Sequence, residues 1–117
     1  MQIDKKKFKV DKNAGVTVCV LDCNYPEISV YSQRFVGITR ICEGDTWDEE
    51  KGKEIAFLKA YLRARSFERK ECNRIGDNCI RESQCLQRHG QNLKNYADAC
   101  MEAINNAYSE LEMLMFA

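Results

Sequence analysis

The residues with the most chemical potential in this 117-residue chain are four soft ligands in its second half. Cys72, Cys79, Cys85 and His89 would supply the four sulfur and imidazole ligands that a structural zinc site needs. Their spacing is loose, and no Cys-x-x-Cys pair of the kind found in small zinc domains occurs in the sequence. Buried thiols and an ordinary histidine near a helix end explain these residues better, so we predict neither a metal site nor a cofactor.

A cysteine nucleophile beside a base is the second chemistry to weigh. Such a site would have to use His89, the sole histidine, with Cys85 one helical turn away as its partner. Neither residue lies in a glycine-rich nucleophile loop. A third candidate is a cluster of carboxylates, namely Glu43, Asp45, Asp48, Glu49 and Glu50. Helix capping and the helix dipole explain that cluster, and no nucleotide-binding or zinc-protease motif occurs, so we predict that the protein is not an enzyme.

Composition narrows the class of protein further. The 18 basic residues balance 18 acidic ones, which excludes a histone-like basic protein and a strongly acidic mimic of DNA. The seven cysteines are an odd number, and the lysine-rich residues 1–10 lack the apolar stretch of a signal peptide. We therefore expect reduced thiols in a cytoplasmic protein without a membrane span.

Residues 1–43 carry the pattern of a small antiparallel sheet. Strands are predicted to begin near 7–10 and to cover 16–21 and 28–36, with 38–42 as a short third strand or as the bulged end of the second. A turn at 13–15 and the Asn24-Tyr25-Pro26 sequence separate these runs. The sequence therefore predicts about three strands, although a shift of one residue would reverse which face is inward.

A capping box marks the change from strands to helices. Thr46 and Glu49 have the spacing in which each side chain bonds to the other residue's amide, which predicts a helix from about Trp47 towards Arg74. Gly52, early in that helix, predicts a close approach to the sheet. Residues 75–78 are interpreted as a helix stop followed by a new cap, with further helices over 79–88 and 92–114.

Small and apolar residues recur every seven positions through the second half of the chain: Cys72, Cys79, Leu86, Leu93, Cys100, Ala107 and Leu114. This row favours helices that pack on one face as a hairpin or bent bundle. We therefore predict an α+β fold in one compact domain, with a strand-strand-helix module at 1–74 and a helical extension at 75–117. The predicted core consists of Val18, Val20, Ile28, Val30, Val36, Ile41, Ile55, Leu58, Leu62, Leu86, Leu93 and Ile104.

Charge is segregated although its sum is zero. Residues 51–90 contain ten basic and five acidic groups. A solvated helix face is one interpretation of this excess, and a contact surface for phosphate or for an acidic protein patch is the other. The predicted partner-binding residues of the second interpretation are Lys51, Lys53, Lys59, Arg63, Arg65, Arg69, Lys70 and Arg74.

The segment Gly37-Ile38-Thr39-Arg40-Ile41-Cys42, with the acidic and aromatic helix start at 45–56, resembles small proteins of Gram-positive bacteriophages and prophages. The resemblance covers roughly residues 16–65. It implies a strand-strand-helix module similar in outline to double-stranded-RNA-binding domains, and it supplies no catalytic residues. It does not imply RNA binding, because Asp48, Glu49, Glu50 and Glu54 dilute the lysine-rich helix start which that module uses.

Three functions follow as expectations. The first is a small non-enzymatic phage accessory protein, such as an anti-CRISPR protein, that binds and inhibits a host defence protein, most plausibly a CRISPR effector nuclease. The alternative is a nucleic-acid-binding module that uses the basic helix. The third is a self-assembling phage structural protein that forms a homodimer through the apolar residues 111–116 of its last helix.

Overall fold

A computed structural model describes residues 1–82 and 84–116, with side chains described outside 83–86. It contains a three-stranded antiparallel sheet in the order β1-β2-β3, followed by two long helices. The elements are β1 (Gln2–Asp11), β2 (Val16–Tyr25), a 3₁₀ turn (Pro26–Ile28), β3 (Val30–Arg40), α1 (Glu49–Glu82) and α2 (Gln84–Phe116). The predicted α+β fold with a sheet of three strands is confirmed.

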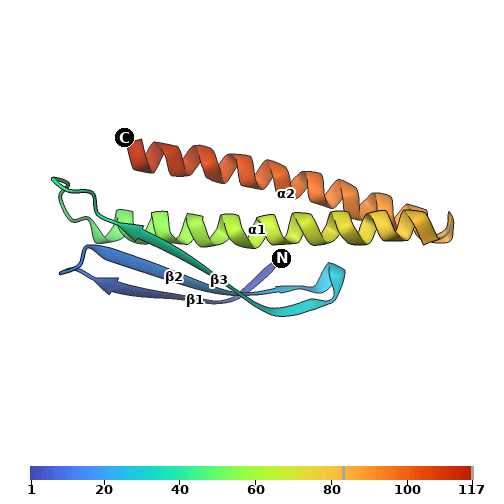
Figure 1. Cartoon of the computed structure of the whole chain (residues 1–117), viewed down its shortest axis with the longest axis horizontal. Helices are drawn as coiled ribbons and strands as arrows, with labels where there is room; N and C mark the ends of the chain where they lie inside the picture. Colours follow the sequence, from blue (N-terminus) through green and yellow to red (C-terminus); the bar gives the residue numbers. More distant parts are fainter. Residues whose placement is uncertain (83, 117) are drawn as a thin grey trace.

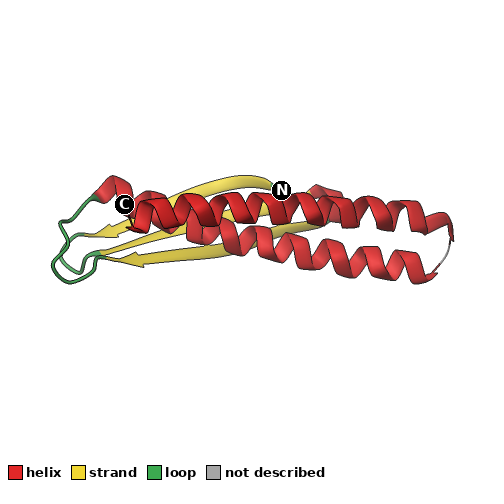
Figure 2. Ribbon diagram, turned by 90° about the horizontal axis from the view of Figure 1, so that it is seen from above, coloured by secondary structure: helices red, strands yellow, loops and turns green. Residues whose placement is uncertain are grey.

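The elements form three layers. α1 lies on one face of the sheet, and α2 runs back along the side of α1 that faces away from the strands (Figure 1). Figure 2 shows that the helices are longer than the sheet and extend beyond it at the hairpin end. The molecule is accordingly elongated, with extents of 58 × 27 × 16 Å. Both helices lie on the same side of the strands, so the other face of the sheet is uncovered (Figure 1).

β2 and β3 form where β-branched residues lie between turn-forming residues. Residues 12–15 make the β1–β2 turn, in which the Ala14 amide donates to Asp11 Oδ1 at 3.1 Å. Gly15 adopts a φ of 66°, a left-handed conformation that glycine tolerates without strain. β3 runs through Gly37 as one strand, so 38–42 is neither a separate strand nor a bulged end. β1 begins at Gln2, five residues before the predicted start.

The predicted inward face of β2 is wrong by one residue. Val18 and Val20 lie half-buried on the outer face, and the residues that point into the core are Thr17, Cys19, Leu21, Cys23 and Tyr25. Apolar and small residues occupy both faces of β2, so alternation alone could not choose between them. The Tyr25 hydroxyl donates to the Ala64 carbonyl at 2.8 Å inside the core, and this hydrogen bond stabilises the observed inward face of β2.

Of the other residues predicted to lie in the core, some are buried and others are not. Ile55, Leu58, Leu62, Leu93 and Ile104 are buried, as predicted. Ile28 and Val30 are half-buried against the sheet core. Val36 lies on the outer face of β3 opposite Val20, and Ile41 is exposed after the end of β3, so both predictions are wrong. Leu86 lies outside the residues whose side chains are described.

α1 starts two residues later than predicted and ends later. Asp48 rather than Thr46 caps it, since Asp48 Oδ1 accepts from the Lys51 amide at 3.1 Å. Gly52 passes close to Thr17 of the sheet, as predicted. The predicted stop at 75–78 is wrong, because α1 continues without interruption to Glu82.

A glycine pair explains why the helix does not stop there. A Cβ atom at Gly76 would lie 2.8 Å from the Gly90 carbonyl oxygen of α2, so this glycine permits a close helix contact instead of a turn. The predicted helix at 79–88 is therefore wrong as well. The boundary predicted at 74/75 falls within α1.

The row of residues seven apart forms the contact between the helices. Cys72, Leu93, Cys100 and Ala107 are buried, and Leu114 packs at the margin of the same interface. This confirms the prediction that the helices pack on one face as a hairpin. No helix within the described ranges is long and apolar enough to cross a membrane.

Candidate interaction surface

The outer face of the sheet is covered by neither helix in the part of the chain that the structure describes. Its residues are paired across the three strands in four rows: Lys5, Asp22 and Arg34; Lys7, Val20 and Val36; Lys9, Val18 and Ile38; Asp11, Val16 and Arg40. We call these twelve residues the open sheet face. A bulge between Ile3 and Lys5 brings three of the four lysines of β1, Lys5, Lys7 and Lys9, onto this face.

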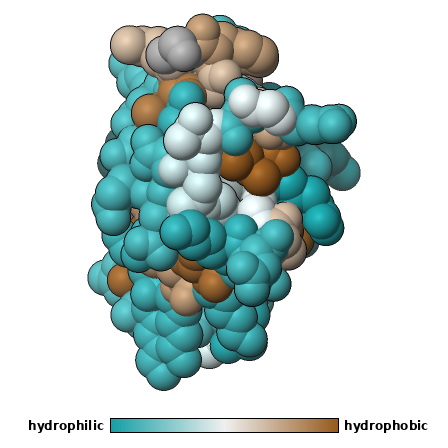
Figure 3. All heavy atoms as spheres, turned by 90° about the vertical axis from the view of Figure 1, so that its left-hand side faces the viewer, coloured by the Kyte–Doolittle hydropathy of each residue, from teal (hydrophilic) through white to brown (hydrophobic). Residues whose placement is uncertain are grey.

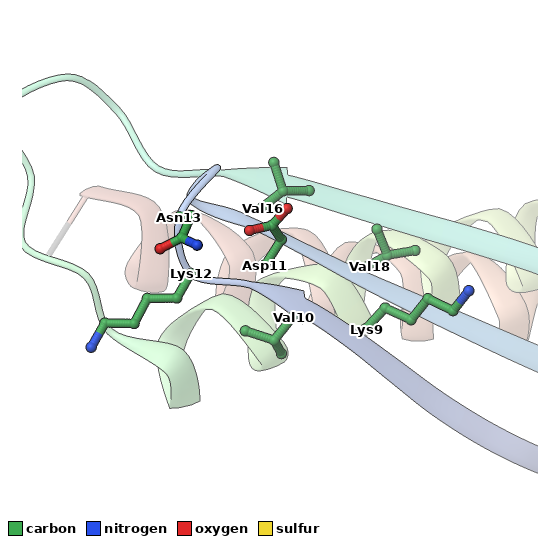
Figure 4. A pocket seen from close by; sticks show the side chains of 7 residues that line it. All are labelled: Lys9, Val10, Asp11, Lys12, Asn13, Val16 and Val18. Atoms are coloured by element: carbon green, nitrogen blue, oxygen red, sulfur yellow. The ribbon is translucent and has the colours of Figure 1, made fainter.

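The open sheet face has an aliphatic centre and a cationic margin. Five aliphatic side chains occupy β2 and β3, and Ile38 is 46% exposed. Figure 4 shows the β1–β2 end of this face, where Val16 and Val18 project to the same side of β2. A shallow hollow there joins the face to Lys12 and Asn13 of the turn. Five cationic side chains and two carboxylates lie beside the centre, on β1 and in the two end rows of the face, which gives the face an excess of positive charge.

One ion pair fixes the charge pattern at the end of the face near residue 24. Arg34 Nε donates to Asp22 Oδ1 at 2.9 Å, and the pair is directly opposed across β2 and β3. The hydrogen bond from Arg34 holds the pKa of Asp22 below its usual range, with smaller contributions from the nearby lysines. Asp22 therefore stays ionised and neutralises Arg34, while the lysines of β1 remain exposed.

The predicted basic residues of α1 do not form one surface. Arg65 Nη1 contacts Glu68 at 2.7 Å, and its Nε bonds to the Tyr61 hydroxyl, so this guanidinium points into the protein. Lys53 lies over the Phe8 ring on the β1 side, 5.8 Å from the ring centroid.

The remaining basic residues lie elsewhere on α1. Lys59 donates to the Ile38 carbonyl of β3 at 3.3 Å, and the i, i+4 spacing places Arg63 on the same side. Arg74 pairs with Glu71 at 2.8 Å. Arg63, Lys70 and Arg74 are exposed, whereas Lys51 and Arg69 are half-buried.

A buried polar cluster lies where β1, α1 and α2 meet. Glu68 is 1% exposed, and three groups approach its carboxylate besides Arg65. The Met1 amino group lies 3.1 Å from Oε2, the Tyr96 hydroxyl donates to Oε2 at 3.2 Å, and the Cys100 thiol donates to Oε1 at 3.1 Å. Two formal positive charges therefore face one buried negative charge.

The pKa shifts in and beside this cluster keep its thiols and its phenol protonated. Burial raises the pKa of Glu68, but hydrogen bonds from Cys100, Arg65 and the Met1 amino group outweigh it, and the net shift is downward. Burial and the adjacent carboxylate raise the pKa of Cys100 to about 12, and those of Cys72 and Tyr96 to about 11 and about 12. These groups therefore stay protonated at neutral pH, so neither thiol is an activated nucleophile.

The structure describes the side chains of three of the four residues considered for zinc, and their burial differs. Cys72 is buried against Leu93 and Ala97, Cys79 is half-buried and His89 is exposed. Cys85 lies outside the residues whose side chains are described. In the part of the chain that the structure describes, no group of three or more His, Cys, Asp or Glu side chains could hold a metal ion.

Sequence reasoning missed both the open sheet face and the Glu68 cluster. The first had a readable signal, since Lys5, Lys7 and Lys9 recur with the period of a strand beside the alternating valines of 16–20. The Glu68 cluster had no such signal in the sequence, because a single glutamate in a helix rich in charged residues is expected to be a solvated side chain.

Comparisons with known proteins add no assignment. No protein-family model, curated protein or solved structure matches this chain. Only the charge, shape and burial of the chain's own surfaces therefore bear on its function.

Proposed function

We propose that this chain is a non-catalytic binding protein that docks its open sheet face against an acidic surface of another protein. The observation that carries the proposal is the aliphatic strip of β2 and β3 framed by Lys5, Lys7, Lys9 and Arg40 on an uncovered face. A largely apolar centre with a charged rim is the usual anatomy of a protein–protein interface. The cationic rim selects partners of negative potential and accelerates their encounter.

A protein partner fits this face better than a nucleic acid. Proteins that bind single strands stack bases on aromatic side chains, and none of the twelve residues of the open sheet face is aromatic. The valines at its centre offer no hydrogen-bond donors to a phosphate backbone. A nucleic acid would therefore meet only the margin of the face, whereas a protein could cover its centre as well.

The size of the face fits the central part of an interface. A stable protein–protein interface has about 20–30 residues on each side, about twice the number on the open sheet face. The hollow that connects the face to Lys12 and Asn13 extends the contact area around the β1–β2 turn. The partner would then cover the sheet and this turn together.

The resemblance of residues 16–65 to small phage proteins is the reason for the partner that we propose. We propose that the acidic surface belongs to a host defence protein such as a CRISPR effector nuclease, and that occupation of that surface inhibits the nuclease. Inhibition by contact needs no catalytic group.

Capture from bacterial lysates that express candidate defence systems tests the proposal. The bait carries its tag at the C-terminus, because the Met1 amino group is buried against Glu68. We compare the natural chain with Lys7→Glu/Lys9→Glu on the open sheet face and with Lys59→Glu/Lys70→Glu on α1, which changes the net charge equally. Nuclease-treated and untreated lysates are compared by mass spectrometry, and the captured protein is then purified and tested for binding and cleavage.

We expect a stoichiometric protein that survives nuclease treatment, is lost with Lys7→Glu/Lys9→Glu and is retained with Lys59→Glu/Lys70→Glu. Adding the chain to the purified partner should reduce cleavage. Recovery of nucleic acid alone, or loss of the partner only with the α1 variant, would replace the proposal with the basic-helix alternative. A purified partner whose cleavage is unchanged would refute inhibition while leaving binding intact.

A further inference from the structure

A cavity of about 650 Å³ lies at the end of the molecule where α1 begins, on the side of the sheet opposite the open sheet face. The start of β2, the segment after β3, the first turn of α1 and Met115 of α2 line it. Figure 3 looks onto this end of the molecule and shows hydrophobic atoms framed by more polar residues. Ile41, Ile55 and the indole of Trp47 give the cavity an apolar lining.

The charges that line the cavity favour a cation. Its carboxylates are Asp45, Asp48, Glu49 and Glu50, and its basic residues are Lys51 and Arg40, of which Arg40 also belongs to the open sheet face at the end of β3. The N-terminus of α1 contributes about half a positive charge, which leaves the lining negative on balance. An anion would therefore meet more repulsion than attraction here, although a helix N-terminus on its own attracts anions.

A second observation, independent of the acidic residues, indicates that a polar ligand group fits here. Thr17 lines the cavity and is 1% exposed, and its hydroxyl faces Gly52, where a Cβ atom would lie 2.9 Å from Oγ1. Among the described residues, one buried side-chain oxygen or nitrogen has no hydrogen-bond partner, and it is this Oγ1. Buried hydroxyls are normally satisfied, so an unpaired one beside a cavity is a free acceptor for a donor group.

We propose that this cavity binds an organic cation, a primary ammonium or guanidinium group on a short aliphatic stem. The stem would pack on Ile41, Ile55 and Met115, and the cationic head would lie near the carboxylates and the face of Trp47. The ammonium would donate to Thr17 Oγ1 after a small displacement of the α1 turn at Gly52, because this oxygen is buried against that glycine. The proposal goes beyond docking through the open sheet face, since it uses the other side of the sheet.

Fluorescence titration tests the proposal, because Trp47 is the sole tryptophan of the chain. The probes are 1,5-diaminopentane, 1,5-pentanediol and glutarate, which share a five-carbon chain and differ in charge, at constant ionic strength. We expect a saturable change with the diamine alone. Thr17→Val and Glu49→Gln/Glu50→Gln should each weaken that binding about five- to tenfold, by removing the acceptor and the attraction respectively.

Asp98→Asn/Glu102→Gln is the matched control, because both acids are exposed on α2 and their loss changes the net charge equally. It should bind the diamine as the natural chain does. Thr17→Val should leave the unfolding midpoint unchanged or raise it, since no protein group is left unpaired, so weaker binding would not reflect unfolding. Saturable binding of glutarate, equal binding by all variants, or no saturable response to the diamine would overturn the proposal.

Discussion

At the scale of single residues, one buried carboxylate organises the centre of the molecule. Glu68 receives Arg65 from its own helix, the Met1 amino group from the start of β1, and Tyr96 and Cys100 from α2. Its partners thus come from three elements that are distant in the sequence. A buried charge that is fully paired adds little net stability, but removing one partner leaves the others buried without compensation.

We expect Glu68→Ala to destabilise the protein by about 3–5 kcal/mol, since Arg65 then lacks its counter-charge and the Met1 amino group keeps only Glu27, 3.8 Å away. Glu71→Ala is the matched control, because it removes an exposed i, i+3 pair with Arg74 from the same helix. That variant should cost less than about 1 kcal/mol. Urea denaturation measures both values, and equal losses would show that the cluster is not structural.

The lowered pKa of Glu68 also predicts a dependence on pH. A carboxyl whose pKa is lower in the folded state than in the unfolded state stabilises the protein above its unfolded value of about 4.3. That contribution is lost as the pH falls through the lower, folded pKa. The urea midpoint of the natural chain should therefore fall more steeply between pH 6 and pH 3 than that of Glu68→Gln. Parallel curves would contradict the assigned direction.

At the scale of elements, close backbone contacts determine how helices and strands pack. Gly37 of β3 lies against the backbone of α1 at Ala56 and Ala60, and Gly76 and Gly90 face each other across the two helices. Their patterns were ambiguous in the sequence, because a glycine next to Asp77 and Asn78 has the appearance of a helix end. Only the partner residue, fourteen positions away, shows that the glycine serves a contact.

The sequence pattern of the strands was ambiguous in a similar way. The number of strands, the turn at 13–15 and the row of small and apolar residues seven apart followed from local residues, and those predictions are confirmed. The inward face of β2 depended on whether cysteines or valines pack against α1, and this choice is made by contacts with Ala56, Ala60 and Ala64. Because of that wrong choice, Val18 and Val20 of the open sheet face were predicted to be core residues.

Gly90→Ala should destabilise the protein, although alanine is the better helix former. The added Cβ would lie 2.6 Å from the Gly76 carbonyl oxygen, so the helices would have to separate. We expect a loss of about 1–3 kcal/mol, as for other overpacked sites. Asn78→Ala, at an exposed position of α1, should be neutral or slightly stabilising. Thermal unfolding compares the two, and a stabilised Gly90→Ala would disprove the close contact.

At the scale of the whole molecule, the chain presents two different faces. The helices cover one face of the sheet and leave the other open, with its aliphatic centre and cationic margin (Figure 1). The sequence predicted a basic contact surface, but it placed that surface on α1, where several of the basic residues bond within the protein. The lysines of the open sheet face lie in residues 1–11, outside the basic excess predicted for 51–90.

Lysine footprinting of the captured complex tests the central claim most directly. Reductive methylation of the natural chain, alone and with its purified partner, is read at each lysine by mass spectrometry. The open sheet face predicts that Lys5, Lys7 and Lys9 become protected in the complex while Lys59 and Lys70 remain as reactive as in the free chain. Protection of Lys59 and Lys70 with unchanged reactivity of the β1 lysines would contradict the account.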